Sequence, residues 1–151
     1  MNNKKLGTQF EKRICEMLKR DGWWVHFIEP KQSGAQPFDI IAVRLGRAIA
    51  IDCKTSASAR FSIDRLEDNQ IFAFEKWMAC GNSEPFIIIE HGEDIYVVPY
   101  KYLKENKSIK LEGLEWARWG VLPVKFAEKN LTYRIWRQHS QVVRGTDVIG
   151  A

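Results

Sequence analysis

One stretch of the sequence constrains the fold of this chain more than any other. Residues 38–54 read FDIIAVRLGRAIAIDCK, two mostly apolar runs joined by the short turn Leu45-Gly46-Arg47. So short a connection predicts two antiparallel strands, 38–44 and 48–54, paired as a hairpin. A carboxylate inside such a pair must be neutralised, bound to a metal or placed at the rim of the sheet, because desolvating it alone costs several kcal/mol. The acids of this stretch are therefore the first candidates for function.

Side-chain alternation gives two of these charged residues a common direction. Asp52 and Lys54 share one face of strand 48–54, opposite to the face of Ile51 and Cys53. The hairpin can place Asp39 beside Asp52, and two carboxylates in contact repel unless a proton or cation lies between them. Oxygen ligands of this kind suit Mg²⁺ or Mn²⁺. The alternatives are structural: an ion pair of Asp52 with Lys54, and a loop cap by Asp39.

Glu11 is a third acid that could meet this pair. Apolar residues recur at three- and four-residue spacing over residues 4–21, which predicts a helix with Gly22 just beyond its end. Glu11 lies next to Phe10 on the edge of the apolar stripe. A helix packed on the sheet could aim Glu11 at the same cation. The alternative is an ion pair with another residue of its own helix.

The other elements follow from the same kinds of pattern. The sequence predicts strands at 23–28, 85–90 and 94–98, a loop at 29–37, a helix from the N-cap Asp64 to about Ala79, a short helix at 100–106 and a last strand at 133–137. The order α-β-β-β-α-β-β is typical of an α/β (α+β) fold in which helices flank a mixed β-sheet.

The length favours one domain over residues 1–151, since domains commonly have roughly 100–150 residues. We expect its core at about 5–98 and a C-terminal extension at 99–151 without an assigned role. The three cysteines show no CxxC spacing, which fits a reducing cytosol better than a disulfide framework. No apolar run approaches the roughly 18 residues of a membrane span, and the N-terminus lacks the apolar region of a secretory signal. We therefore expect a cytoplasmic protein without membrane contact.

Basic charge is concentrated at the N-terminus. Residues 1–20 hold six lysines and arginines and two glutamates, a balance of +4 that equals the formal charge of the whole chain. Such an element suits a polyanionic partner such as nucleic acid. A solvated helix face is the alternative.

Taken in order, these residues resemble a known family signature. Glu11 followed by Asp39, twelve intervening residues and Asp52-Cys53-Lys54 resembles the PD-(D/E)xK nuclease superfamily, which implies a restriction-endonuclease-like fold. The resemblance implies that Asp39, Asp52 and the backbone carbonyl of Cys53 hold one or two Mg²⁺ ions, with Mn²⁺ as an alternative. It also implies that Glu11 is a direct or outer ligand and that Lys54 orients or activates the attacking water.

Within the superfamily the chain resembles Holliday-junction resolvases. GTQFEKRICEMLKRDGW is similar to the first helix of archaeal resolvases, and KQSGAQPFDIIAV with AIDCKT is similar to their serine-containing loop and metal strands. Residues 61–89 resemble the RecU type, and this implies a place near the active site for Gln70. The literal Pro-Asp pair is absent, because Phe38 separates Pro37 from Asp39.

The sequence thus predicts a metal-dependent endonuclease that hydrolyses phosphodiester bonds in branched DNA, a Holliday-junction resolvase. Because a four-way junction is resolved by paired cuts, we expect a C₂ homodimer, with Trp77 or Phe74 as candidates for its interface. We expect no small-molecule cofactor. The expected catalytic residues are Glu11, Asp39, Asp52, Lys54 and Gln70. The expected DNA contacts are Lys4, Lys5, Lys12, Ser33, Arg44, Arg47, Arg60 and Arg65. The alternatives are a restriction-like or nicking nuclease on linear duplex DNA, and a catalytically inactive DNA-binding module on the same fold.

Overall fold

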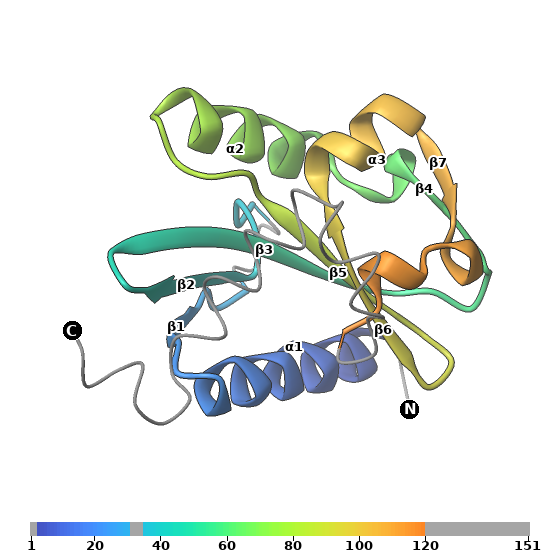
Figure 1. Cartoon of the computed structure of the whole chain (residues 1–151), viewed down its shortest axis with the longest axis horizontal. Helices are drawn as coiled ribbons and strands as arrows, with labels where there is room; N and C mark the ends of the chain where they lie inside the picture. The colour runs from blue at the N-terminus through green and yellow to red at the C-terminus, as the bar shows by residue number, and fades with distance from the viewer. Residues whose placement is uncertain (1–2, 31–34, 120–151) are drawn as a thin grey trace.

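A mixed five-stranded sheet forms the centre of the protein, with α1 on one face and α2 and α3 on the other (Figure 1). The computed structural model describes residues 3–30 and 35–119. The helices are α1 (Asn3–Arg20), α2 (Asp68–Ala79) and α3 (Tyr100–Asn106), and the strands are β1 (Trp24–Phe27), β2 (Ile40–Arg44), β3 (Arg47–Thr55), β4 (Arg60–Ser62), β5 (Phe86–His91), β6 (Asp94–Pro99) and β7 (Ser108–Lys110). The strand predicted at 133–137 lies outside the described residues. The predicted mixed sheet flanked by helices is confirmed.

α1 is an amphipathic helix that buries one stripe against the sheet. Phe10, Ile14 and Leu18 are buried on that stripe, as their three- and four-residue spacing predicts. Gly22 ends the helix with a φ of 92°, a value that favours glycine. The Trp23 amide donates to the Leu18 carbonyl, which satisfies one of the free carbonyls at the helix end.

The predicted hairpin is present as β2 and β3. The two strands are antiparallel, with Ile40 opposite Ile51 and Arg44 opposite Arg47. β3 is parallel to β5, and the remaining neighbours in the sheet are antiparallel. β3 is thus a central strand, and this explains why its run from residue 49 to 53 is buried throughout.

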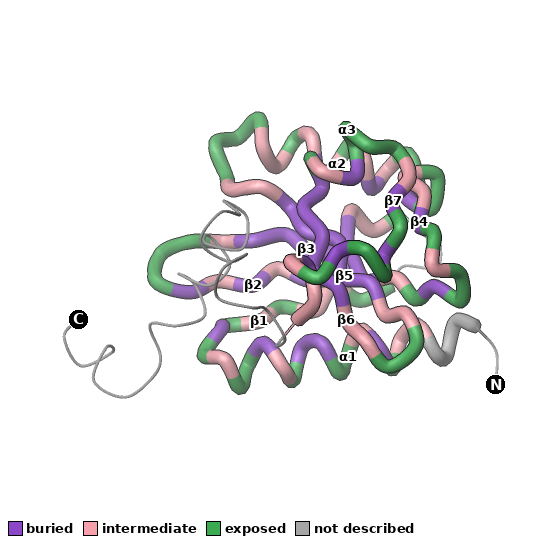
Figure 2. The backbone as a smooth tube through the Cα atoms, turned by 45° about the vertical axis from the view of Figure 1, so that its right-hand side comes forward, coloured by how far each residue is buried: buried purple, intermediate pink, exposed green. Residues whose placement is uncertain are grey.

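Each face of the sheet has its own apolar core. Ile49, Ile51 and Cys53 pack on the side of α1, whereas Ala50 packs on the side of α2 and α3. Figure 2 shows the buried backbone running through the central strands, with the helices buried on part of their surface. The core on the α2 side extends beyond residue 98, since the side chains of residues 100, 103, 109, 111, 114 and 117 are all buried in it.

The start of α2 differs from the prediction. Ser62 caps a single 3-10 turn, η1 (Ile63–Arg65), by accepting a hydrogen bond from the Asp64 amide. The backbone then turns extended at Leu66, whose side chain is buried. This burial interrupts the helical path, so α2 begins at Asp68 with Glu67, not Asp64, as its N-cap.

Two short strands were not predicted from the sequence. β4 and β7 pair antiparallel as a separate two-stranded sheet. Each has three residues, too few for an alternation to stand out from background. Two further 3-10 turns, η2 (Leu111–Gly113) and η3 (Glu115–Ala117), follow β7. Over the described ranges, no helix is long and apolar enough to cross a bilayer.

Candidate active site

Asp39 and Asp52 lie side by side at the open end of the β2–β3 hairpin. The pairing of Ile40 with Ile51 places Asp39 opposite Asp52 at the next step of the register. Asp52 is completely buried and Asp39 nearly so. The Cys53 amide donates to Asp39 Oδ2 at 2.8 Å, which fixes the orientation of that carboxyl group. The hairpin thus brings the two acids together as predicted.

Gln70, near the start of α2, connects this pair to Lys54. Its Nε2 donates to Asp52 Oδ1 at 2.8 Å, and its Oε1 accepts from Lys54 Nζ at 3.3 Å. The same Oε1 accepts from the Glu67 amide at 3.0 Å, as part of a capping box. Gln70 therefore ties the first turn of α2 to the end of β3.

One oxygen of Asp52 lacks a hydrogen bond. Asp52 Oδ2 is fully buried and has no hydrogen-bond partner within the described residues. Lys54 Nζ lies 3.3 Å from it, within ion-pair distance but without hydrogen-bond geometry. A buried acceptor of this kind carries a desolvation penalty unless a cation or a proton meets it. The donor set of this end of the hairpin thus fits a hard divalent cation.

The electrostatics of the two carboxyl groups point the same way. Burial raises the pKa of Asp52 well above its usual range, the Asp39 charge raises it further, and Lys54 opposes both. Burial also raises the pKa of Asp39, while the Cys53 amide and Lys54 oppose this. The close approach of the two carboxyl groups lowers the pKa of Asp39 and raises that of Asp52. Two acids so placed hold a proton or a cation between them at neutral pH.

Glu11 approaches this pair from the other face of the sheet. Burial raises the pKa of Glu11 to about 7, Asp39 raises it further, and Lys54 opposes the shift. Glu11 is therefore within electrostatic range of both residues. Among the described residues, however, three or more acidic, histidine or cysteine side chains do not converge as one metal-binding group. The structure brings Asp39 and Asp52 together and leaves Glu11 at their margin, because α1 packs on the opposite face from Asp52.

Cys53 contributes its backbone to the site. Burial raises the pKa of its thiol well above the usual range, as do the charges of Asp39 and Asp52, so the sulfur stays protonated. Its N–H already points to the β2 side, where it meets Asp39, and the N–H and C=O of one strand residue point to the same side. The Cys53 carbonyl is therefore directed to the side of Asp39.

The expected DNA contacts fall into separate groups. Arg65 lies beside the site, where its Nη2 donates to the Thr55 carbonyl at 2.8 Å. Arg60 begins β4, five positions after Thr55, and Lys12 is exposed on α1 next to Glu11. The side chains of residues 4 and 5, and residue 33, lie outside the described part of the chain.

Arg44 and Arg47 do not accompany the carboxyl pair. They face each other at the closed end of the hairpin, four steps along the register from the Ile40–Ile51 pair. The Arg44 side chain is buried, and burial lowers its pKa, while Asp21 opposes that shift. The reason for their separation is the length of the hairpin, which places Arg44 and Arg47 at the end remote from Asp39 and Asp52.

The apolar candidates for a dimer interface are also distributed differently. Phe74 is completely buried in the core, because it packs between Phe38 and Tyr100, so it is not available at a surface. Phe72 is 72% exposed, and Trp24 is 62% exposed. Phe72 was not among the predicted interface residues, although its position on the outer side of α2 could have indicated its exposure.

Two features of the site were not predicted. The Cys53 amide that orients Asp39 is a backbone group, and no residue pattern announces it. The double role of Gln70 as capping residue and carboxylate partner did have a signal, since Glu67 and Gln70 have the E-x-x-Q spacing of a capping box. That signal was read three residues too early, at Asp64 and Glu67.

Comparison with known proteins identifies the family. The family described as "Archaeal holliday junction resolvase (hjc)" matches residues 2–115. The "Crossover junction endodeoxyribonuclease Hjc" of Methanocaldococcus jannaschii is 23% identical over 107 residues, which are 70% of this chain and 75% of that protein. The solved structure of Archaeoglobus fulgidus Hjc, a Holliday junction resolvase, shares the fold with a TM-score of 0.57 at 17% identity, covering 80% of this chain and 98% of that one. The predicted resemblance to archaeal resolvases is confirmed, and the chain belongs to the archaeal Holliday junction resolvase (Hjc) family.

Proposed function

We propose that this protein is a metal-dependent endonuclease that resolves four-way DNA junctions. Membership in the Hjc family supports the activity, and the names of the relatives give the same substrate. The observation that carries the proposal is the buried pair of Asp39 and Asp52, in which Asp52 contacts Lys54 and Gln70. A protein that only binds DNA gains nothing from buried carboxylates, which repel phosphate.

Asp39 and Asp52 would hold the ion, with help from the Cys53 carbonyl and from Glu11 directly or through water. We propose Mg²⁺, with Mn²⁺ as an alternative, because both prefer oxygen ligands. The unbonded Asp52 Oδ2 supports this assignment. When bound, such an ion lowers the pKa of water and offsets negative charge on the phosphate oxygens.

The chain's own residues prepare the site before any ion or DNA arrives. Gln70 donates a hydrogen bond to Asp52 Oδ1, and the Cys53 amide donates one to Asp39 Oδ2. The second oxygen of each carboxyl group is thus left for the ion. Lys54 directs its ammonium group towards Asp52 and Gln70. An ammonium group has three donors, and one of them is used in the hydrogen bond to Gln70, so others remain for the attacking water or the scissile phosphate.

Arginines and lysines around the site would hold the DNA backbone. Arg65 is the best placed, because its guanidinium lies 5.2 Å from the centre of the Phe61 ring and is bonded to the Thr55 carbonyl. One of its five N–H groups is used in that bond, and others remain for a phosphate. We retain Lys4, Lys5, Lys12, Ser33 and Arg60 as proposed DNA contacts. Arg44 and Arg47 could contact only a distant part of the substrate.

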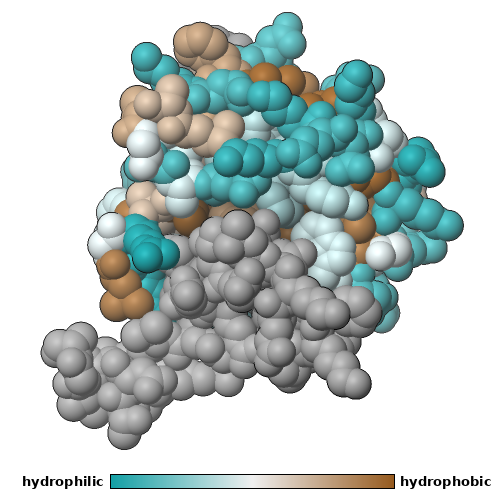
Figure 3. Space-filling model, turned by 45° about the horizontal axis from the view of Figure 1, so that its top comes forward, coloured by the Kyte–Doolittle hydropathy of each residue, from teal (hydrophilic) through white to brown (hydrophobic). Residues whose placement is uncertain are grey.

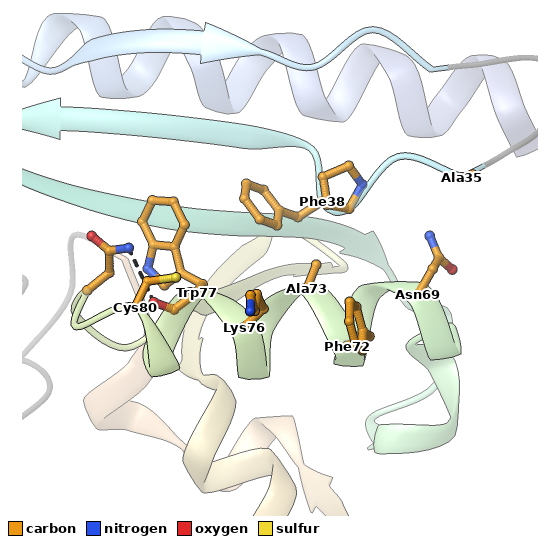
Figure 4. Close-up of a pocket in the computed structure, with 10 residues that line it drawn as sticks. Ala35, Phe38, Asn69, Phe72, Ala73, Lys76, Trp77 and Cys80 are labelled. Atoms are coloured by element: carbon orange, nitrogen blue, oxygen red, sulfur yellow. Dashed lines mark hydrogen bonds between the residues drawn. The ribbon is translucent and has the colours of Figure 1, made fainter.

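A homodimer would supply two identical sites for paired cuts. We propose that its interface includes the outer side of α2, where an apolar groove of about 450 Å³ is lined by Phe38, Phe72, Ala73, Trp77 and neighbouring residues (Figure 4). Phe72 projects at its border, so one surface carries both a knob and a hole, as an isologous interface requires. Figure 3 shows a coloured surface that is mostly hydrophilic, with moderately hydrophobic residues exposed at its upper left. Phe72→Asp should shift the mass measured by light scattering from dimer to monomer, whereas Lys19→Asp, at an exposed position on α1 outside the groove, should have a smaller effect.

Cleavage of defined substrates tests the function directly. The protein is incubated with a labelled four-way junction or the matching linear duplex, with Mg²⁺ or EDTA, beside Asp52→Asn. Paired, symmetric cuts in the junction alone, lost with EDTA and in the variant, are the expected result. Equal cutting of both substrates would favour a restriction-like or nicking nuclease. Binding without cutting in Mg²⁺ or Mn²⁺ would favour an inactive DNA-binding module. Because the proposed substrate is cellular DNA, we place the protein in the cytoplasm.

A further inference from the structure

The small β4–β7 sheet presents two cations and two hydroxyl groups on one face. Its three residue pairs are Arg60–Lys110, Phe61–Ile109 and Ser62–Ser108. Opposed residues share a face and successive residues alternate. Phe61 and Ile109 are both buried in the core, so the two flanking pairs face outward. This outer face, made of Arg60, Ser62, Ser108 and Lys110, is called the ribbon face below.

The two cations of the ribbon face are placed against each other. Arg60 and Lys110 are exposed and directly opposite, an arrangement of like charges that destabilises a strand pair. Arg60 Nη1 donates to Ser108 Oγ at 3.3 Å. Within the described residues, no acidic side chain forms an ion pair with Lys110. An anion bound between Arg60 and Lys110 would turn their repulsion into attraction for a shared ligand.

The two hydroxyl groups are prepared to act as donors. Ser62 Oγ accepts from the Asp64 amide at 3.1 Å, and Ser108 Oγ accepts from Arg60. A hydroxyl group has one donor besides its acceptor positions, so each O–H remains available. Two cations and two hydroxyl donors are the groups with which proteins hold DNA phosphates.

The ribbon face is physically tied to the active site. The Leu111 amide donates to the Ala59 carbonyl at 2.8 Å, so β7 is anchored to the segment that follows β3. β4 in turn leads through η1 into α2, which carries Gln70. Figure 1 shows β4 and β7 on the side of the molecule where α2 begins. Of the acids nearby, Glu112 lies 3.6 Å from the Nε2 atom of His91, and Asp64 is exposed in η1.

We propose that the ribbon face binds a backbone phosphate of the DNA arm that extends from the active site. The inference rests on the proposed function and deepens it, since it names a phosphate subsite outside the carboxylate cluster and adds Lys110, Ser62 and Ser108 to the DNA contacts. Binding there is independent of base sequence, because phosphates carry no sequence information.

Salt-dependent junction binding tests the subsite. Every protein carries Asp52→Asn to prevent cleavage, and its affinity for the labelled junction is measured at several salt concentrations in Ca²⁺. The test variant combines R60Q with K110Q. The control combines K19Q with R20Q, which removes two charges at the C-terminal end of α1. The test variant should bind about tenfold more weakly near 0.1 M salt, and its slope of log affinity against log salt should fall by about 1 to 2. The control should change both values much less.

A charge reversal separates binding from folding. K110E places a carboxylate opposite Arg60, which should leave the melting midpoint unchanged or raise it, while junction binding becomes weaker than in K110Q. Unchanged affinity and salt slope in R60Q/K110Q and in K110E, with the parent protein binding the junction, would overturn the subsite alone. A parent protein that neither binds nor cuts the junction would instead overturn the proposed function.

Discussion

The two ends of the β2–β3 hairpin carry charged residues in opposite circumstances. At the open end, the buried Asp39 and Asp52 receive bonds from the Cys53 amide and from Gln70, with Lys54 alongside. At the closed end, Arg44 and Arg47 are opposite each other, and the Arg44 guanidinium has no hydrogen-bond partner among the described residues. Charged residues at the end of a strand pair thus form a candidate active site where other elements supply hydrogen-bond donors and opposite charges. α2 reaches the open end with Gln70, whereas at the closed end Arg44 lies within range of the Asp21 charge but donates no side-chain hydrogen bond to the described residues.

The largest effect is expected at the open end, from Asp52→Asn. Cleavage of the junction should fall by about a thousandfold or more, because the change removes a proposed ligand charge. The amide keeps the shape and removes one of two repelling buried acids, so thermal stability at neutral pH should stay the same or rise. Single-turnover cleavage and thermal melting of the same preparation check both outcomes. A variant that retains parental cleavage would remove Asp52 from the active site.

Lys54→Met should lower both activity and stability. We expect about a hundredfold loss of cleavage, since a positive donor near the reacting phosphate is removed. Asp52 also loses the cation beside its unbonded oxygen, and this should lower the free energy of unfolding by about 1–3 kcal/mol. Urea denaturation without divalent ions measures this cost. Lys101→Met, an exposed lysine on α3, is the matched control and should change neither quantity appreciably.

Gln70 offers a comparison of two substitutions. Gln70→Ala removes the donor to Asp52 and the capping bond to Glu67, so it should reduce cleavage about tenfold and stability by about 1 kcal/mol. Gln70→Glu retains an acceptor for the Glu67 amide and adds a third acid beside Asp52. Its stability should therefore depend on Mg²⁺ more steeply than that of the parent, as measured by melting with and without the ion. Equal metal dependence in the two proteins would contradict this account of the site.

The raised pKa of Glu11 determines how we expect the stability of the metal-free protein to change with pH. Its pKa is raised from 4.5 to about 7 in the folded state, so the folded protein holds this proton more tightly than the unfolded chain. Stability should therefore fall as pH rises from about 4.5 through 7, in the direction set by proton linkage. The raised pKa values of Asp39 and Asp52 act in the same sense. Melting in EDTA across this range, beside Glu11→Gln, should show a smaller fall in the variant, and a stability that rises with pH would contradict the prediction.

The smallest effect is expected at the closed end. Arg47→Gln removes an exposed charge that is far along the hairpin from the carboxyl pair, so cleavage should change less than twofold and stability by less than about 0.5 kcal/mol. Kinetics and melting of this variant, beside Lys54→Met, measure the contrast between the two ends. A large loss of cleavage would mean that the closed end also engages the junction.

Local patterns were sufficient for most of the fold. The β2–β3 hairpin, α1 with its end at Gly22 and α3 at residues 100–106 all match their predictions, because each depends on side chains a few residues apart. The start of α2 had two local candidates, and local spacing alone did not decide between them. Whether the helix began after Asp64 or Glu67 depended on Leu66 entering a core that distant segments build.

The sequence by itself determined which residue types meet at the open end of the hairpin. Strand alternation set Asp52 and Lys54 on one face, and the short turn fixed the register that brings Asp39 alongside. The tertiary structure decided the rest: the Cys53 amide on Asp39, the bridge from Gln70, the approach of Glu11 from α1 and the opposition of Arg60 to Lys110. The physical reason is that these contacts join residues from separate elements. Their geometry depends on how α1, α2 and β7 pack on the sheet, and no local spacing encodes that packing.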